Sequence, residues 1–302
     1  MLDYPNDQSE FETLFATEEA CREYLATIRW PSGFACPGCK NEQVWQLPNG
    51  IMACQQCGRK TSVTAGTLFH DTHYPLHVWF QAIWYVVGQK YGSSALGLQR
   101  LLGLGSYHTA WAWLHRLRRA MVRPGRDRLD GTVEVDETYW GGAKVGKRGR
   151  GAAGKTLIFV AVAYDEKKLQ RIRLLCIPDV SGSTLLEAVS QSVVPGSMVD
   201  TDGWCGYNGL NAAGYIHRNV RTTTGDDDDL LPRVHLVVSL LKRWLMGTHQ
   251  GGVQASHLDY YLDEFTFRFN RRSSHTRGLL FRRILENAVQ LEPLRESDLH
   301  AK

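Results

Sequence analysis

The chain has 302 residues, 43% of them hydrophobic and 22% charged, with a formal net charge of +4 and a pI near 8.6. This composition excludes a disordered or fibrous chain and suits about two globular domains, and the mildly basic balance permits a polyanionic partner. The longest apolar run, residues 157–163, is too short to span a bilayer, and no secretory signal opens the sequence. We therefore expect a cytoplasmic protein with no membrane partner.

Residues 1–30 are expected to form a helical lead-in to a ribbon at residues 31–66. The ribbon contains two C-x2-C pairs separated by fourteen residues, and the intervening segment has the two arms of a hairpin. Each pair turns two thiolates toward one ion, and four thiolates leave no open coordination position, so this spacing predicts a structural zinc ion. The alternative is four reduced cysteines without metal. The expected zinc ligands are Cys36, Cys39, Cys54 and Cys57.

A helical segment is expected next, at residues 67–125. It includes a short helix at 93–103 that ends in glycine, followed by a helix at 106–119 that begins with a serine and ends in basic residues. This order is what a helix-turn-helix requires, and its second helix would enter the major groove of double-stranded DNA. A packed helical hairpin with a solvated basic end is the alternative. The expected DNA contacts of this helix are Tyr107, His108, Thr109 and Arg116.

Beyond Pro124 the periodicity changes from helical to alternating, which marks a domain boundary near residues 123–131. The order that follows is strand, strand, strand, helix, strand, helix, which resembles ribonuclease H. The expected fold is therefore α/β: a ribonuclease H-like catalytic domain at 126–290, preceded by the ribbon and the helix-turn-helix-like segment, with a tail at 291–302. The four strands are expected at 132–139, 156–164, 171–177 and 197–203, and the intervening helix at 183–189.

Two aspartates stand where that architecture brings strands together. Asp136 is on the first strand and Asp202 is at the end of the fourth, and these two strands are neighbours in the ribonuclease H sheet. Paired carboxylates can bridge divalent cations that activate a water or hydroxyl and stabilise the oxygen leaving phosphorus. Alternation alone does not choose between Asp136 and Glu134, or between Asp202 and Asp200, because each pair shares a face. Solvated acidic residues at strand ends are the alternative.

Four blocks of the sequence resemble the zinc-ribbon DDE insertion-sequence transposases of the family fifteen-ninety-five. They are VDETYWGG at 135–142, TDGWCGY at 201–207, LKRWLMGTHQG at 241–251 and YLDEFTFRFNRR at 261–272. The resemblance extends from the ribbon to about residue 285 and selects Asp136 and Asp202 as catalytic metal ligands. It implies an enzyme that binds the inverted ends of an insertion sequence and catalyses DNA strand cleavage and transfer with magnesium or manganese. It also implies a homo-oligomer, at least a dimer when two ends are paired.

Transposases of this type usually carry a third acidic residue on a late helix, seven positions before a lysine or arginine. Counting back from Lys242 lands on His235, and seven residues are two helical turns, so the two side chains share a face. The resemblance places His235 in the catalytic site, with Lys242 and Arg243 on DNA phosphates beside it. Three roles are open for His235. It is a metal ligand, which would suit Mn²⁺ better than Mg²⁺, or it acts as a base or orients water. In the third alternative, its presence in place of an acidic residue means that the chain has lost catalysis. Glu264, on another expected helix, is the fallback carboxylate for the role of third metal ligand.

A glycine-rich loop after the Asp136 strand carries cations and no acidic residue, and we expect it to contact DNA phosphates. The cations of this loop are Lys144, Lys147, Arg148 and Arg150. A competing hypothesis for the whole chain is a catalytically inactive, transposase-derived DNA-binding regulator. Such a protein would keep the ribbon and the helices and would have lost its chemistry through His235.

Overall fold

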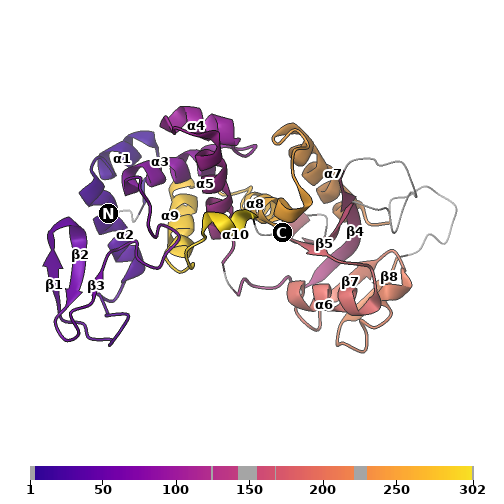
Figure 1. Ribbon diagram of the computed structural model, residues 1–302. Helices are drawn as coiled ribbons and strands as arrows, with labels where there is room; N and C mark the ends of the chain where they lie inside the picture. Colours follow the sequence, from indigo (N-terminus) through magenta and orange to yellow (C-terminus); the bar gives the residue numbers. More distant parts are fainter. Residues whose placement is uncertain (1–3, 124, 142–154, 167, 221–229, 301–302) are drawn as a thin grey trace. The chain divides into compact units, whose positions relative to one another are not determined.

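The computed structural model describes residues 4–123, 125–141, 155–166, 168–220 and 230–300 (Figure 1). The chain divides into two compact units. The first comprises residues 1–123 together with 274–302, and the second comprises residues 124–273. Residues 274–290, which were expected in the second domain, therefore lie in the first unit. None of the helices in the described ranges is long and apolar enough to cross a membrane.

The first unit combines a small antiparallel sheet, in the order β1-β2-β3, with seven helices among its described residues (Figure 1). The lead-in is helical, as the sequence predicted. The elements before the ribbon are α1 (Gln8–Leu14) and α2 (Glu18–Arg29). The ribbon contains β1 (Val44–Leu47), η1 (Pro48–Gly50), β2 (Ile51–Cys54) and β3 (Lys60–Thr61). The remaining helices are α3 (Leu76–Gly88), α4 (Ala95–Leu102), α5 (Tyr107–Ala120), α9 (Arg277–Ala288) and α10 (Glu296–His300).

The return of the chain to the first unit is explained by an aromatic core. Phe281 of α9 is fully buried, with its ring centroid 5.7 Å from that of Phe11, 5.5 Å from Phe15 and 5.4 Å from Phe80. Arg277, at the start of the same helix, donates to the carbonyl of Trp84 at 2.6 Å and lies over its indole ring. Burying a phenylalanine of this size contributes about 1.5–3 kcal/mol, so α9 belongs to this core whatever precedes it in the sequence.

The second unit is built on a five-stranded sheet with the order β6-β5-β4-β7-β8. Strands β4, β5 and β6 are antiparallel neighbours, whereas β7 and β8 run parallel to β4. The first and fourth strands along the chain are therefore adjacent, as expected. The strands are β4 (Thr132–Trp140), β5 (Thr156–Asp165), β6 (Lys168–Ile177), β7 (Met198–Thr201) and β8 (Ile216–Asn219). The helices are α6 (Gly182–Ser192), η2 (Cys205–Tyr207), α7 (Pro232–Gly247), η3 (Ala255–His257) and α8 (Leu258–Asn270).

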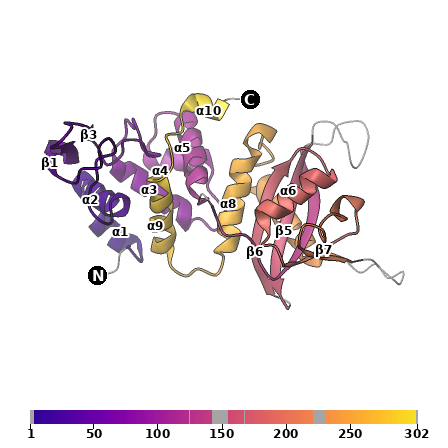
Figure 2. The ribbon, with the colours of Figure 1, turned by 90° about the horizontal axis from the view of Figure 1, so that it is seen from below.

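Helices cover both faces of this sheet, which accounts for the apolar run on β5. Phe159 and Ala161 pack with α6 on one face, while Val160 and Val162 pack with α7 and α8 on the other. Figure 2 draws α6 in front of the sheet. A strand covered on both faces is apolar at every position rather than at every second one. Strand β8 was absent from the expected order because its sequence, Ile-His-Arg-Asn, is largely polar and exposed at the sheet edge.

Candidate active site and zinc centre

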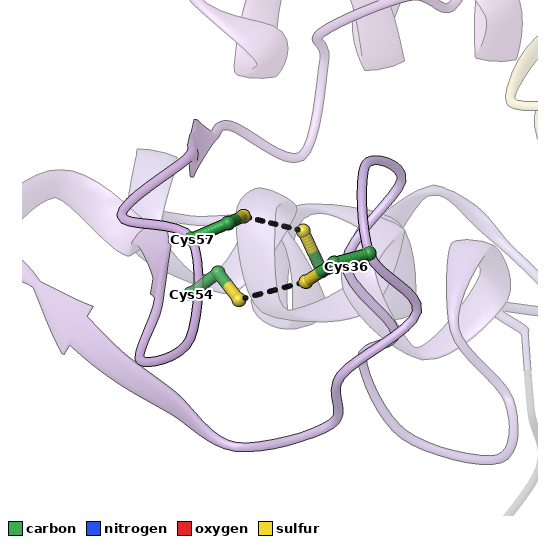
Figure 3. Close-up of side chains that lie close together, drawn as sticks. Cys36, Cys54 and Cys57 are labelled. Carbon is green, nitrogen blue, oxygen red and sulfur yellow. Dashed lines mark hydrogen bonds between the residues drawn. The ribbon is translucent and has the colours of Figure 1, made fainter.

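The four cysteines of the ribbon converge on one point. Figure 3 labels three of them, Cys36, Cys54 and Cys57. Cys36 and Cys39 lie in the loop before β1, Cys54 ends β2, and Cys57 lies in the turn that follows. The Sγ atoms of Cys36 and Cys57 are 3.6 Å apart, those of Cys39 and Cys54 are 3.5 Å apart, and all four lie within 4.8 Å of one another. A tetrahedral zinc ion with bonds of about 2.3 Å requires sulfur separations of about 3.8 Å, so these donors fit zinc.

Local backbone donors prepare one of these thiols for metal binding. The N–H of Cys57 donates to the Cys54 sulfur and, with the N–H of Gln56, lowers the pKa of the Cys54 thiol from its usual 9.0 to about 6, although burial opposes the shift. The core beneath the cysteines is small and consists mainly of Phe34 and the partly buried Trp30. The ribbon therefore depends on its ion for stability, because its apolar contacts are few.

Helices α4 and α5 form the helix-turn-helix-like pair. Helix α4 ends at Gly103, whose φ of 62° is left-handed, and α5 begins after Ser106, whose hydroxyl accepts from the N–H of His108. The first turn of α5 is open to solvent: Tyr107 is 55% exposed, His108 is exposed and Thr109 is half-buried. These three predicted DNA contacts thus lie together on an accessible surface.

Arg116 has a different environment. It is half-buried, and its Nε donates to the carbonyl of Leu294 at 3.1 Å, so it holds the C-terminal segment of the first unit. Trp113 and Arg118 of the same helix are buried, and the indole of Trp113 stacks on that of Trp79 with centroids 3.6 Å apart. Helix α5 is therefore mostly a core helix, and only its ends are exposed. This could not be read from its sequence, in which two tryptophans are followed by three arginines.

The two predicted aspartates come together in the second unit. The parallel register of β4 and β7 pairs Val133 with Val199 and Glu134 with Asp200. Asp202 follows directly after β7, and it lies close enough to Asp136 for its negative charge to raise the pKa of that residue. The Asp136 side chain is 19% exposed, and its Oδ1 accepts from the N–H of Glu137 at 2.8 Å. Burial and the negative charge of Asp202 raise the pKa of Asp136, although the Glu137 N–H and His235 oppose the shift.

Helix α7 brings His235 to the same place. The His235 Nε2 lies 3.4 Å from Oδ2 of Asp136, and the imidazole is 52% exposed. Lys242 and Arg243 are exposed about 10 Å further along the helix, since each residue of a helix advances by about 1.5 Å. Among the described residues, only the four cysteines have all their potential ligand atoms within 4.8 Å, so those of Asp136, Asp202 and His235 are more widely spaced. Lys144, Lys147, Arg148 and Arg150 lie outside the described residues.

The partners of the neighbouring carboxylates resolve the ambiguity within each pair. Glu134 is buried, forms an ion pair with Arg233 at 2.7 Å and accepts from two backbone N–H groups. Asp200 is also buried, and its two oxygens accept from Arg218 at 2.7 and 2.6 Å and from the Tyr164 hydroxyl at 2.8 Å. Both carboxylates are thus compensated by an arginine and further protein donors, whereas Asp136 has a second carboxylate, Asp202, and the imidazole of His235 near it.

The fallback carboxylate is part of the scaffold. Glu264 on α8 is buried, and its Oε1 accepts from the Nε and Nη2 of Arg268, one turn later, at 2.8 and 2.7 Å. A buried carboxylate compensated in this way holds α8 together rather than offering a metal ligand.

Sequence reasoning missed the residues that support the site. Arg233 lies two positions before His235, and its guanidinium stacks on the Tyr164 ring at 3.7 Å from the ring centroid. Tyr207 is buried, and its hydroxyl donates to the carboxylate of Glu137, the residue next to Asp136. The sequence did contain one signal near Arg233. The helix begins at Leu231-Pro232, and neither residue has a side chain that can accept from the first backbone N–H groups, so an acceptor from another part of the chain is required.

Comparison with known proteins agrees with this arrangement. Residues 128–270 match the family model described as ISXO2-like transposase domain, and residues 16–60 match the one described as transposase zinc-ribbon domain. The chain thus carries both domains, a zinc ribbon and a transposase domain, of the insertion-sequence transposases that its motifs resemble. It is also 27% identical over 276 residues to a protein of Halobacterium salinarum described as an uncharacterized protein in transposable element ISH50. That match covers 84% of this chain and 91% of the relative.

Proposed function

We propose that this chain is a catalytically active transposase, which cleaves the ends of an insertion sequence and transfers its strands into target DNA. The observation that carries the proposal is the proximity of Asp136 to Asp202, with the imidazole of His235 3.4 Å from Asp136. Three residues that are far apart in the sequence, one on β4, one directly after β7 and one on α7, thus lie near one another. In this proposal the second unit is a ribonuclease H-like domain, supported by its β6-β5-β4-β7-β8 order.

The donor set suits divalent cations. Asp136 and Asp202 supply the carboxylate oxygens that Mg²⁺ and Mn²⁺ prefer, and the imidazole of His235 favours Mn²⁺ over Mg²⁺. When bound, the ions supply activation of a water or 3′-hydroxyl and stabilisation of the oxygen leaving phosphorus. The protein holds Asp136 ready by directing the Glu137 N–H at its Oδ1, and directs the Trp204 N–H at Oδ1 of Asp202.

DNA binding is assigned to several surfaces. In the first unit the zinc-organised ribbon and the exposed first turn of α5, with Tyr107 and His108, would recognise the inverted ends of the element. In the second unit Lys242 and Arg243, on the exposed side of α7, would hold phosphates near the reacting bond. The same role is proposed for the cations of the 144–150 loop. Two ends must be paired for transposition, so we expect a homo-oligomer on DNA.

The test is cleavage of element-end DNA by the full-length protein in Mg²⁺ or Mn²⁺. We expect the wild type to cut, with Mn²⁺ at least as effective as Mg²⁺, and Asp136→Asn and Asp202→Asn to lose at least 100-fold of the rate because each removes a cation ligand. His235→Ala should retain more activity in Mn²⁺ than either aspartate variant. Lys242→Ala is the matched comparison, because it should weaken DNA binding without changing metal dependence.

Binding of the ends without cleavage in either metal would instead identify the inactive DNA-binding regulator. Normal cutting by His235→Ala would remove His235 from the site while leaving the two aspartates in place.

A further inference from the structure

Helix α7 begins without a cap from its own sequence. Leu231 occupies the N-cap position and Pro232 the first helical position, and neither offers a side-chain acceptor. The first backbone N–H groups of a helix have no partner within it and must find an acceptor elsewhere. Here the N–H groups of Arg233 and Val234 both donate to Oε2 of Glu134, at 2.8 and 2.9 Å. A buried carboxylate on β4 therefore caps a helix that begins about one hundred residues later in the chain.

The side chain of Arg233 joins the same anchor to two more parts of the sheet. Its Nη1 donates to Oε1 of Glu134 at 2.7 Å, and its Nη2 donates to the carbonyl of Glu166, after β5, at 2.8 Å. Its guanidinium also stacks on Tyr164 of β5. The first turn of α7 is thus held to β4, to β5 and to the turn beyond β5. Both oxygens of Glu134 take part in this anchor.

The anchor and the candidate metal site both lie between β4 and α7, and they follow each other along these two elements. Glu134 and Asp136 are separated by two residues on one face of β4, which is about 6.6 Å along the strand. Val234 and His235 are adjacent on α7. The hydrogen bond from the N–H of Val234 to Glu134 therefore fixes where α7 begins along β4 and how the helix is rotated about its axis. This in turn fixes where the His235 side chain lies relative to Asp136.

We propose that Glu134 is a positioning residue of the catalytic site, which fixes the start of α7 so that the His235 imidazole is presented to the Asp136 carboxylate. This inference rests on the proposed function, because it assigns a purpose to the His235–Asp136 contact. Glu134 acts through α7 and does not bind the cation itself, since both of its oxygens are occupied by Arg233 and the helix N–H groups.

The molecule contains a matched control. Asp200 is the direct register partner of Glu134, is equally buried and is likewise paired with an arginine, Arg218. Its described partners, Arg218 and Tyr164, are on β8 and β5. The Tyr164 ring also contacts Arg233, but the N–H groups at the start of α7 donate to Glu134 and not to Asp200. Asp200→Asn therefore removes a carboxylate of the same kind at the same depth and leaves the acceptor of the α7 cap in place.

The experiment measures Mn²⁺ binding to the full-length, zinc-loaded protein by electron paramagnetic resonance of the free ion. The variants are Glu134→Gln, His235→Ala, their double mutant, Asp200→Asn and Asp136→Asn. Loss of a residue that orients a metal ligand typically costs 10–100-fold in affinity, and we expect a loss of about 10-fold for Glu134→Gln. The double mutant should bind no more weakly than His235→Ala alone, because both changes remove the same contact. Asp200→Asn should bind as the wild type does.

Amide hydrogen exchange supplies a readout independent of metal. The N–H groups of Arg233 and Val234 should exchange faster in Glu134→Gln and at the wild-type rate in Asp200→Asn. Only the first change replaces their charged acceptor with a neutral amide, whose NH2 group also stands where one carboxylate oxygen accepted. Should Glu134→Gln not fold, Arg233→Lys tests the same anchor. It keeps the cap and the charge but loses the planar guanidinium that reaches Glu166 and stacks on Tyr164, and it should weaken Mn²⁺ binding to a smaller extent.

The results separate two kinds of failure. Wild-type Mn²⁺ affinity in Asp136→Asn would refute the proposed function itself. The positioning role alone is wrong if Asp136→Asn and His235→Ala bind Mn²⁺ weakly while Glu134→Gln binds it with wild-type affinity. Where Glu134→Gln does not fold, Arg233→Lys takes its place in this comparison. Equal losses in Glu134→Gln and Asp200→Asn would also overturn that role, because they would reflect general destabilisation. The same holds if the losses of Glu134→Gln and His235→Ala multiply in the double mutant.

Discussion

Glu134 and Asp200 face each other across the parallel strands β4 and β7, and each buried carboxylate is paired with its own arginine. Two residues further along the chain in each case, Asp136 and Asp202 lie near each other, and burial and this second negative charge raise the pKa of Asp136. The second unit therefore carries one pair of carboxylates compensated by arginines and a second pair in which one carboxylate raises the pKa of the other. The two pairs should respond in opposite ways to mutation.

Asp136→Asn is expected to stabilise the protein in the absence of added Mg²⁺ or Mn²⁺, while abolishing cleavage. The folded-state pKa of Asp136 lies above the unfolded one, so its contribution to stability is complete below the unfolded pKa, near 4, and is lost as the pH rises through the raised folded pKa. At pH 7 the ionised group thus opposes folding. Calorimetry should show a higher Tm, by about 2–4 °C for each kcal/mol. Asp200→Asn is the control and should lower the Tm; a lower Tm for Asp136→Asn would contradict the argument.

Zinc is expected to leave the ribbon as the pH falls into the acidic range. The thiolate is the metal-binding form, so protons compete with the ion for all four sulfurs, and the lowered pKa of the Cys54 thiol lets this ligand keep its thiolate to a lower pH than an ordinary cysteine. Release can be followed with a chromogenic chelator across a pH series, with far-UV circular dichroism reporting the loss of ribbon structure. Cys54→Ser should release zinc at neutral pH. Cys205→Ser, at an exposed cysteine outside the ribbon, should behave as the wild type, and zinc retained at pH 4 would argue against this assignment.

Tyr107→Ala and His108→Ala are expected to weaken binding to element ends by about tenfold each, because a lost base contact costs about 1–3 kcal/mol. Both side chains are exposed, so the fold should be unaffected. Fluorescence anisotropy with element-end and unrelated DNA measures the effect, which should be confined to the element end. Arg119→Gln, at the exposed far end of the same helix, should change both affinities alike. Equal losses on the two DNAs for Tyr107→Ala would show that α5 does not read sequence.

Glu264→Gln is expected to destabilise the second unit by about 3–5 kcal/mol, since it leaves the largely buried Arg268 without its carboxylate. Urea unfolding measures this loss. Mn²⁺ affinity measured under native conditions should stay at the wild-type value, because Glu264 lies on α8, within an ion pair of its own. A fall in Mn²⁺ affinity without a loss of stability would return Glu264 to the list of candidate ligands.

Local patterns were sufficient where the chemistry is local. The cysteine spacing predicted a site whose four sulfurs do converge, because two tight turns and a short hairpin allow few other arrangements. Alternation and the apolar run at 157–163 predicted four of the five described strands of the second unit, because the period of a strand is visible in its own residues. The pairing of β4 with β7 then brought Asp202 near enough to Asp136 to raise its pKa.

The tertiary structure decided what depends on partners remote in sequence. Periodicity shows that α9 has an apolar face but not that this face buries Phe281 in the first unit, and it shows a basic α5 but not that Arg116 holds Leu294. Glu134 and Asp136 lie on the same face of the strand by their spacing, so the sequence pattern does not distinguish them. Their neighbours do: Glu134 contacts Arg233 and the start of α7, whereas Asp136 lies near Asp202 and His235. A sequence records which residues can pair, whereas the energetic role of a buried carboxylate is set by the charges that folding brings to it.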